Sequence, residues 1–394
     1  MINKVIFFID FPFDERDYDR FGIKILQENE LNTEIWDFSP ILHPEIYQRD
    51  KSFLRIARSG YYLFLNTDAA LNAILKLHKN EVFIICLIPY NINSYKIYRT
   101  LSKNELKYCV FMANALPVPG RNNGNRFSII RLFGKLRKIT GKKLVMFLYS
   151  NFCRFRMRIG IKPATAILAG GEKSIYYNYP IGPKTEILWL HTLDYDIYLR
   201  EKEQPTQVDE RLGVFLDEYL PFHPDYAYIG LSPFATPDKY YSIVCNFFDF
   251  LERRYGVRII VAAHPRSNYE SLPDYFSRRP VIKGKTAELV RKSKFVITHA
   301  STAINFVILF KKPLIFITTD ELKKSKEGPL IETIAALLNK KPIDISAPLK
   351  IDFGKELQID EQAYERYKND YIKKNGSEEK PFWRLFADYI KSIK

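Results

Sequence analysis

Short apolar runs alternate with amphipathic stretches along most of the chain. In the first half, the pattern predicts buried strands at 4–10, 33–38, 61–66, 81–90, 107–112 and 165–169, with a helix over 68–79. In the second half it predicts strands at 226–232, 258–263, 294–300 and 313–319, separated by helices at 238–254, 285–293 and 301–310. Strands that alternate with helices favour an α/β fold with parallel sheets.

The two halves share this layout, which predicts two Rossmann-like domains facing each other across a cleft, the GT-B architecture. We expect one domain over 1–200, a second over 212–350 and C-terminal helices over 355–394. The last of these helices is amphipathic and is expected to pack back onto the body. In such folds a ligand lies at the carboxyl ends of the strands.

Charge points to an anionic partner. The 394 residues include 60 Lys and Arg against 45 Asp and Glu, a formal net charge of +15. The four cysteines form no CxxC pair, which disfavours a disulfide framework or a zinc cluster and fits a reducing cytosol. No apolar run reaches the roughly 18–20 residues that span a bilayer. Any membrane contact is therefore expected to be peripheral.

The most basic stretch covers residues 121–163. It contains 12 Lys and Arg, interleaved with Leu, Phe, Ile, Met and Tyr, and no Asp or Glu. This composition fits an interfacial helix on anionic lipid. A solvated helix, a groove for acceptor phosphates and a nucleic-acid surface are alternatives. We expect an anionic membrane surface as the partner here and no nucleic acid.

The first motif that carries chemistry is His264-Pro265-Arg266, directly after the strand at 258–263. Pro265 constrains the turn, so the imidazole is aimed out of the sheet. Arg266 adds a charge suited to a phosphate. We expect a nucleotide phosphate here; the alternative is a turn histidine bonded only to backbone.

The second motif follows the strand at 294–300. Ser301 and Thr302 are expected to open a helix, and a helix start offers unpaired N–H groups to an anion. Their hydroxyls would add donors to a phosphate. The alternative is that they only cap the helix, and His299 beside them is either a ligand or a structural histidine.

The third motif is the acid pair Asp217-Glu218, which follows a short apolar run. A carboxylate can take the proton from an acceptor hydroxyl during group transfer. Adjacent side chains on an extended segment point to opposite sides, so one of the two is expected to face the cleft. We favour Asp217 over Glu218; the alternative is a surface turn with solvated acids.

Four weaker features complete the candidates. Lys283 is expected to line the donor pocket, with a solvated position as the alternative. The segment Asp194-Tyr-Asp196 spells DxD, but three letters are a weak signal and we expect no metal. The segment 170–174, GGEKS, is a candidate backbone nest for an anion. Asp10 and Asp14, after the first strand, either meet the acceptor or lie in a solvated loop.

The order of these motifs, an acid pair, a strand with His-Pro and a strand with Ser/Thr, resembles the bacterial GT-B sialyltransferases. The polysialyltransferases and Kdo transferases are similar. The resemblance implies Asp217 or Glu218 as the general base. It places His264 on the CMP phosphate, assisting the leaving group, and Ser301 with Thr302 around that phosphate.

The resemblance covers about residues 212–320, and it departs from the family at Tyr219, where the family has Gly. It implies an inverting, metal-independent glycosyltransferase of bacterial surface polysaccharide or lipopolysaccharide synthesis. The first domain would take the acceptor and the second the nucleotide sugar. The donor would be a CMP-linked nonulosonic acid or Kdo, and the acceptor an oligosaccharide or lipid-linked glycan. The expected location is the cytoplasmic face of the cell membrane.

Three alternatives remain open. A UDP-sugar glycosyltransferase would use the same fold. A CDP-polyol phosphotransferase resembles the His-Pro and Ser/Thr pattern followed by KKPLIFI, and there His264 would act as the base. The third alternative is a protein without catalysis that binds a membrane or nucleic acid through 121–163.

Overall fold

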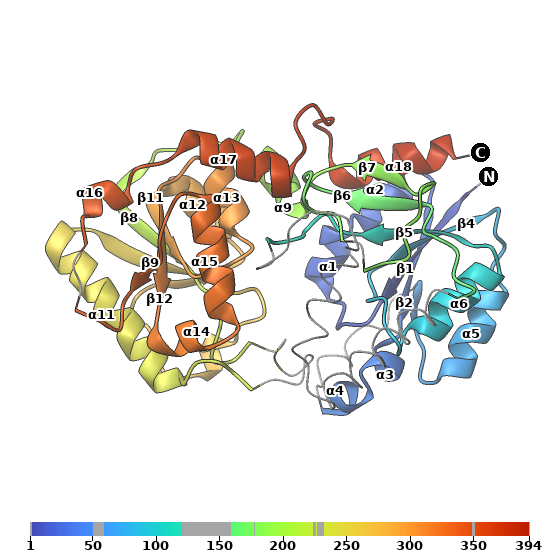
Figure 1. Ribbon diagram of the computed structural model, residues 1–394, viewed down its shortest axis with the longest axis horizontal. Coiled ribbons are helices and arrows are strands. Elements are labelled where there is room, and N and C mark those ends of the chain that lie inside the picture. Colours follow the sequence, from blue (N-terminus) through green and yellow to red (C-terminus); the bar gives the residue numbers. More distant parts are fainter. Residues whose placement is uncertain are drawn as a thin grey trace, which may run out of the picture.

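The computed structural model describes residues 2–49, 59–117, 119, 159–176, 178–223, 226, 232–348 and 351–393. Two parallel sheets lie next to each other, one in each half of the chain (Figure 1). The expected α/β architecture of the GT-B type, with two Rossmann-like halves, is confirmed. The basic segment 121–163 lies outside the described residues except for its last five, 159–163.

The first sheet has the strand order β3-β2-β1-β4-β5-β6-β7, and all its neighbours are parallel. Its strands are β1 (Lys4–Ile9), β2 (Asn32–Asp37), β3 (Tyr61–Leu63), β4 (Val82–Cys86), β5 (Lys107–Phe111), β6 (Ala166–Ala169) and β7 (Glu186–Trp189). Strand β7 was not expected, because it is short, lies at the sheet edge and is only partly buried.

Alternate residues of β1 enter two different cores. Val5 and Phe7 face a cluster that includes helices α2 (Ile23–Glu28) and α18 (Phe382–Ser392). Ile6 and Phe8 face a second cluster with the helices α3 (Ser39–Leu42), α5 (Thr67–Leu75) and α6 (Tyr95–Lys103). This two-sided burial explains why β1 is a continuous apolar run.

The second sheet has the order β10-β9-β8-β11-β12-β13. Its strands are β8 (Asp209–Leu216), β9 (Arg258–Ala263), β10 (Val281–Lys283), β11 (Ser293–Thr298), β12 (Leu314–Thr318) and β13 (Ile343–Asp344). The helices between and after them are α9 (Leu193–Glu201), α11 (Pro237–Tyr255), α12 (Thr286–Lys292), α13 (Ile304–Leu309), α14 (Asp320–Lys324), α15 (Glu327–Leu337), α16 (Phe353–Glu356) and α17 (Glu361–Tyr367).

Strand β8 is one of the two central strands of this sheet, and the sequence suggested it only as a short apolar run before the acid pair. The strand expected at 226–232 lies outside the described residues except for its two ends, which are not in a strand. The helix expected from 301 begins at Ile304 instead, because residues 301–303 form a turn.

The chain returns to the first half at its C-terminus, as expected (Figure 1). Helix α17 packs on the core of the second half through Tyr364 and Tyr367, and α18 then packs on the first-half cluster that contains Val5 and Phe7. Trp383 of α18 is 1% exposed and contacts the ring of Phe7 edge-on, and its Nε1 donates to the carbonyl of Arg20 at 2.8 Å.

Gly22 adopts φ +55°, and a Cβ there would lie 2.2 Å from the ring of Trp383. The indole therefore requires both a left-handed backbone and the absence of a side chain at this position. This close approach holds the last helix of the chain against the first domain.

Replacing Trp383→Ala should lower the free energy of unfolding by about 3–5 kcal/mol, because a large buried ring and a buried hydrogen bond are lost. Urea unfolding followed by circular dichroism measures this. The matched control is Arg384→Ala on the same helix, where an exposed side chain is removed at a cost within about 0.5 kcal/mol. Equal effects of the two substitutions would contradict the stabilising role of the contact between Trp383 and Gly22.

Candidate functional site

Each sheet reverses its strand order at one point. In the first sheet, the chain turns back between β1 and β4; in the second, between β8 and β11. Connections leave such a point toward opposite faces, which opens a crevice at the carboxyl ends of the strands. The three expected motifs follow β8, β9 and β11, so the fold brings them to the reversal point of the second sheet.

Asp217 follows β8 and is 3% exposed. Its Oδ1 accepts from the backbone N–H of Tyr219 at 3.0 Å. Its Oδ2 accepts from the Tyr269 hydroxyl at 2.9 Å and from the backbone N–H of His264 at 3.4 Å. Burial raises its pKa to about 6, although these hydrogen bonds lower it. The carboxylate thus joins the acid pair to the His-Pro loop.

Tyr219 adopts φ +55°, the left-handed region that favours glycine. The sialyltransferases that the acid pair resembles have Gly at this position. The backbone here therefore has the conformation that glycine would allow, although the residue is tyrosine. Its ring packs against those of Phe222 and Tyr269, with centroids 5.4 and 5.2 Å away, which offsets the backbone strain.

Glu218 is half-buried and reaches the third motif. Its Oε1 accepts from the backbone N–H groups of His299 and Ala300 at 3.2 and 2.7 Å. Burial, followed by the charges of Glu327 and Asp217, raises its pKa to about 8, although these N–H groups lower it. Of the two acids, Glu218 is the more exposed, whereas the sequence favoured Asp217 as the cleft-facing acid.

His264 follows β9, and its ring lies against that of His223 with centroids 4.6 Å apart. Its Nδ1 accepts from the backbone N–H of Arg266 at 3.2 Å. Burial, followed by the charges of His223, Arg266 and Arg16, lowers its pKa to about 3. The imidazole is therefore neutral, and because Nδ1 is an acceptor, its proton lies on Nε2.

The other residues of these loops differ in exposure. Pro265 is half-buried beside His264, while Arg266 is exposed. Lys283 lies on β10, and its Nζ donates to the carbonyl of Ser267 at 3.0 Å. This contact attaches the strand to the His-Pro loop, so Lys283 supports the loop that carries His264.

Ser301 and Thr302 lie in the turn before α13, half-buried and exposed respectively. Neither caps the helix: the N-cap is Ala303, and the Ser301 Oγ accepts from the N–H of Ala303 at 3.2 Å. His299 is fully buried, with Nδ1 bonded to the carbonyl of Ile317 and Nε2 to the hydroxyl of Tyr240. Its ring is structural, and burial lowers its pKa to about 4.

Arg16 connects this edge to the first half of the chain. It lies on α1 (Glu15–Arg20), which follows β1 and is near the second half in Figure 1. Its charge is close enough to lower the pKa of His264, and its own pKa is lowered by burial and by Arg20. Positive groups thus approach the His-Pro loop from both halves.

Two of the weaker candidates have structural contacts instead. The Asp194 carboxylate accepts from the Asn305 side chain at 3.0 Å, and Asp196 accepts from the N–H of Phe382 at 3.0 Å. They join α9 to α13 and α18. Asp14 is the N-cap of α1, where its side chain accepts from the N–H of Asp17 at 2.9 Å.

The GGEKS loop is covered by the C-terminal segment. A Cβ on Gly171 would lie 2.2 Å from the backbone of Asp370 and Tyr371, so glycine is needed for chain packing. The N–H of Glu172 also donates to the carbonyl of Asn369 at 2.9 Å. The loop therefore binds another part of the chain rather than an anion.

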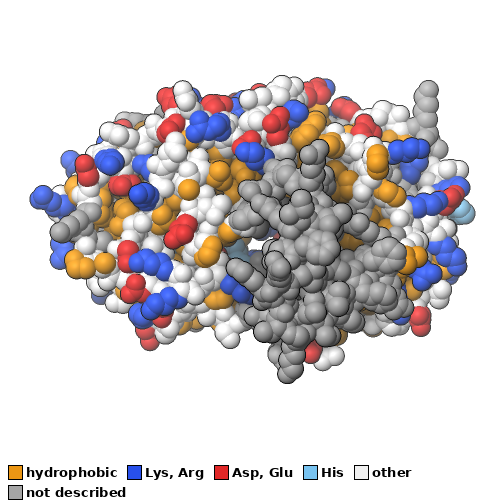
Figure 2. Space-filling view, in the orientation of Figure 1, with side chains coloured by type: hydrophobic (Ala, Val, Ile, Leu, Met, Phe, Trp, Pro, Cys, Tyr) orange, Lys and Arg blue, Asp and Glu red, His pale blue; other side chains and the backbone are white. Residues whose placement is uncertain are grey.

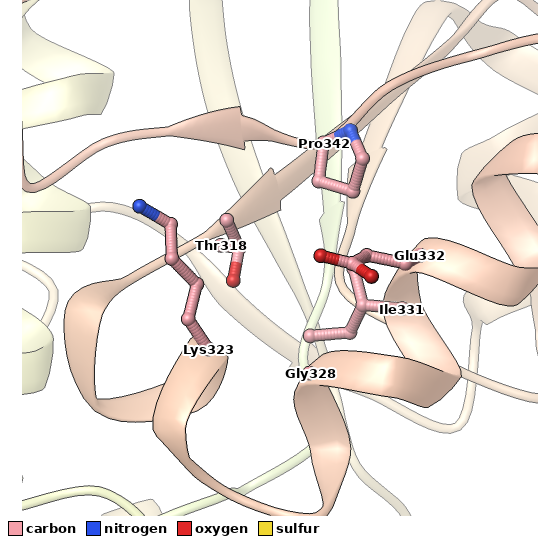
Figure 3. Close-up of a pocket in the computed structure, with 6 residues that line it drawn as sticks. All are labelled: Thr318, Lys323, Gly328, Ile331, Glu332 and Pro342. Carbon is pink, nitrogen blue, oxygen red and sulfur yellow. The ribbon is translucent and has the colours of Figure 1, made fainter.

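Two cavities lie apart from the motifs. One of about 80 Å³ is lined by Thr318, Lys323, Gly328, Ile331, Glu332 and Pro342 (Figure 3). The hydroxyl of Thr318 points into it, but the volume is far below the 300–1,000 Å³ typical of ligand pockets. The other, an open groove of about 440 Å³, is lined by Tyr18, Gln27, Asn32, Thr33, Glu34, Ser59, Gly60 and Tyr62. Neither contains a residue of the three motifs.

Charge and metal ligands complete the description of the site. Lys and Arg side chains are spread over both halves in Figure 2 and are mixed with Asp and Glu. Within the described parts of the chain, no three His, Cys, Asp or Glu side chains gather as they would around a metal ion.

Comparison with known proteins concerns architecture alone. No family model and no curated protein matches the chain. It is similar to the UDP complex of MnaA from S. aureus (11% identity, TM-score 0.48, covering 100% of this chain and 98% of that one). It is also similar to UDP-GlcNAc 2-epimerase from Methanocaldococcus jannaschii (11%, 0.45, 99% of each chain) and to MurG from Acinetobacter baumannii (8%, 0.47, 99% and 100%). At these values the likeness assigns no activity.

The raised pKa of Glu218 has a consequence for stability. A carboxyl with a raised pKa binds protons more tightly in the folded protein than in the unfolded one. Its contribution to the free energy of unfolding therefore falls as the pH rises from about 4 to about 8. Glu218→Gln has no titrating group at this position and so does not lose this stability. We expect the variant to gain stability over wild type across this window, reaching on the order of 2–4 kcal/mol at pH 9.

Urea unfolding of both proteins at pH 5, 7 and 9 measures the difference. The control is Glu270→Gln, which changes an exposed glutamate on the short turn Tyr269–Ser271. Its difference from wild type should stay constant with pH. A constant difference for Glu218→Gln would show that this carboxyl has an ordinary environment.

Proposed function

We propose that this protein is a glycosyltransferase that uses a nucleotide-activated sugar and binds the nucleotide at the second sheet. One observation carries the proposal. Three motifs separated in sequence, at Asp217-Glu218, His264 and Ser301, meet at the carboxyl ends of β8, β9 and β11. This is the point where a parallel sheet with reversed strand order binds its ligand.

His264 acts in this proposal as a neutral hydrogen-bond donor. Its Nε2–H would contact a phosphate oxygen of the donor and stabilise the negative charge that develops as the sugar leaves. Arg266 and Arg16 would supply the positive charge, since the imidazole does not carry one. The hydroxyls of Ser301 and Thr302 would add donors around the same phosphate.

The two acids have different roles. Three donors hold the carboxylate of Asp217, which is buried, so we assign it the positioning of the His-Pro loop. Glu218 is bonded to two backbone N–H groups at the edge of the phosphate site. Because its pKa is about 8, it is mostly protonated at neutral pH, which makes it a poor proton acceptor there.

The donor and acceptor remain those that the motif resemblance implies. We propose a CMP-linked nonulosonic acid or Kdo as donor and a saccharide hydroxyl as acceptor, with a UDP-sugar as the alternative. Contact with an anionic membrane through 121–163 stays a prediction. In the described part of the chain, no helix has the length and apolar character needed to cross a membrane.

Nucleotide binding tests this proposal directly. We expect CMP to raise the melting temperature, since a ligand at 100 times its dissociation constant adds about 2.7 kcal/mol of stability. His264→Ala should weaken CMP binding about tenfold or more, because a half-buried donor to the phosphate is lost. Thermal-shift titrations with CMP, CDP and UDP measure both effects.

The matched control is His78→Ala, which removes an exposed histidine after α5. It should leave nucleotide affinity unchanged. A larger response to UDP would assign a UDP-sugar donor, and a larger response to CDP would favour polyol-phosphate transfer. No response to any of the three nucleotides would refute a nucleotide-sugar enzyme.

A further inference from the structure

The open groove of about 440 Å³ belongs to the first half of the chain alone. Residues of α1, α2 and β2, of β3 and of the segment that leads into β3 line it. Five of its eight lining residues, from Asn32 to Glu34 and at Ser59 and Gly60, are at the amino ends of β2 and β3. In a parallel sheet these ends lie opposite the carboxyl ends, where the ligand crevice of such folds opens. The groove is therefore distinct from the proposed nucleotide site at the second sheet.

The groove lies where β3 is shorter than β2. The pairing of these strands starts where Ile35 faces Tyr61, and the N–H of Ile35 donates to the carbonyl of Gly60 at 2.8 Å. Asn32–Glu34 therefore pair with β1 alone among the described strands. Gly60 adopts φ +84°, and a Cβ there would lie 3.0 Å from the carbonyl oxygen of Thr33. Glycine lets the segment before β3 approach β2 closely, and the edge of β2 forms one wall of the groove.

The groove offers no positive charge, although the whole chain carries a formal net charge of +15. None of the described residues that line it is Lys or Arg, and its one acid is Glu34. Both carboxylate oxygens of Glu34 already have donors. Oε1 accepts from Nζ of Lys4 at 2.7 Å, and Oε2 accepts from Nε1 of Trp36 at 2.9 Å. A phosphate or another anion would meet no cation among the lining residues, so the groove fits an uncharged ligand.

Amide and hydroxyl groups form much of the remaining lining. Gln27, Asn32 and Ser59 are exposed. The Nε2 of Gln27 donates to Oγ1 of Thr33 at 3.2 Å, which orients the amide. Amide and hydroxyl side chains can both donate and accept hydrogen bonds. The hydroxyl groups of a sugar do both as well, so this lining can bond to them in either direction.

Two tyrosine rings lie along the same groove, Tyr18 from α1 and Tyr62 from β3. Tyr62 is 48% exposed, and its ring packs edge-on against that of Trp36 with centroids 6.2 Å apart. The C–H faces of a pyranose ring are apolar and pack on aromatic rings, whereas its hydroxyls bond to polar groups. Tyrosine combines an apolar ring with a polar tip, which matches such a ligand.

The lining does not favour an extended peptide. A peptide that adds a strand to a sheet edge is recognised by pockets for its alternate side chains. Among the described residues that line the groove there is no Leu, Ile or Val. The edge of β2 therefore lacks the apolar pockets that a peptide strand would use.

We propose that this groove is a carbohydrate-binding site that holds an uncharged saccharide chain outside the proposed catalytic site. Its volume lies within the range typical of small-molecule sites, about 300–1,000 Å³. None of its residues belongs to the three motifs, so this proposal and the proposed function can fail separately. A glycosyltransferase with such a site binds a long glycan by sugars remote from the reacting end, which raises its affinity over that of a short glycan.

Isothermal titration calorimetry with uncharged linear oligosaccharides tests the site. The panel is maltoheptaose, mannopentaose and N-acetylchitohexaose, with oligosialic acid as the charged comparison, each up to about 10 mM. We expect at least one uncharged oligosaccharide to bind wild type. Tyr62→Ala should weaken this binding about fivefold or more, because an aromatic contact with the sugar is lost. Asn32→Ala should weaken it about threefold, because a hydrogen bond to a sugar hydroxyl is lost.

The matched control is Leu65→Ala, which removes an exposed apolar side chain that follows β3 and does not line the groove. It should leave the affinity for the saccharide unchanged, and circular dichroism checks that each variant is folded. Failure of every uncharged oligosaccharide to bind wild type would overturn the proposal. Equal affinities of Tyr62→Ala and wild type, or tighter binding of oligosialic acid than of the uncharged chains, would overturn it as well.

Competition with CMP, CDP and UDP separates this site from the nucleotide site. We expect none of the three to displace the saccharide, because the groove and the three motifs share no residue. Displacement by a nucleotide would place the saccharide at the second sheet and overturn the proposal. If wild type binds the saccharide through Tyr62 and binds no nucleotide, the glycosyltransferase proposal fails and the carbohydrate site remains.

Discussion

The buried carboxylate of Asp217 is the contact on which the geometry of the second sheet's edge depends. It accepts hydrogen bonds from Tyr219, Tyr269 and His264, which belong to separate turns of the chain. A buried charge with fewer donors would be costly, so the three segments are held in one arrangement. The backbone of His264 is fixed in this way, and the neighbouring N–H of Arg266 then fixes its ring.

The edges of the two sheets differ in the groups that they present. The second sheet presents a neutral histidine, hydroxyl groups and nearby arginines, which suit an anion that gains charge. At the first sheet, Oδ2 of Asp10 lies 2.9 Å from Nε2 of His43. Two contacts connect the C-terminal residues to the first half. Trp383 bonds to the carbonyl of Arg20, and the backbone of residues 369–371 packs on Gly171.

The local parts of this picture were predictable from the sequence. Buried strands such as β1 and β9 are continuous apolar runs, and a polar residue at the end of such a run lies at the sheet edge. The convergence of His264, Asp217-Glu218 and Ser301 followed from strand order alone. The burial of Asp217 was not predictable, because it depends on Tyr269, which is 52 positions away. The pairing of Asp10 with His43 and the covering of GGEKS by 369–371 depend equally on contacts between distant segments.

The position of a bound nucleotide tests the central claim most directly. Crystals grown with CMP, and separately with UDP, would locate the phosphate. The account predicts a phosphate within hydrogen-bond distance of Nε2 of His264 and of the Ser301 hydroxyl, at the carboxyl ends of β8 and β11. A nucleotide bound elsewhere, for example in the groove lined by Tyr18 and Tyr62, would contradict it.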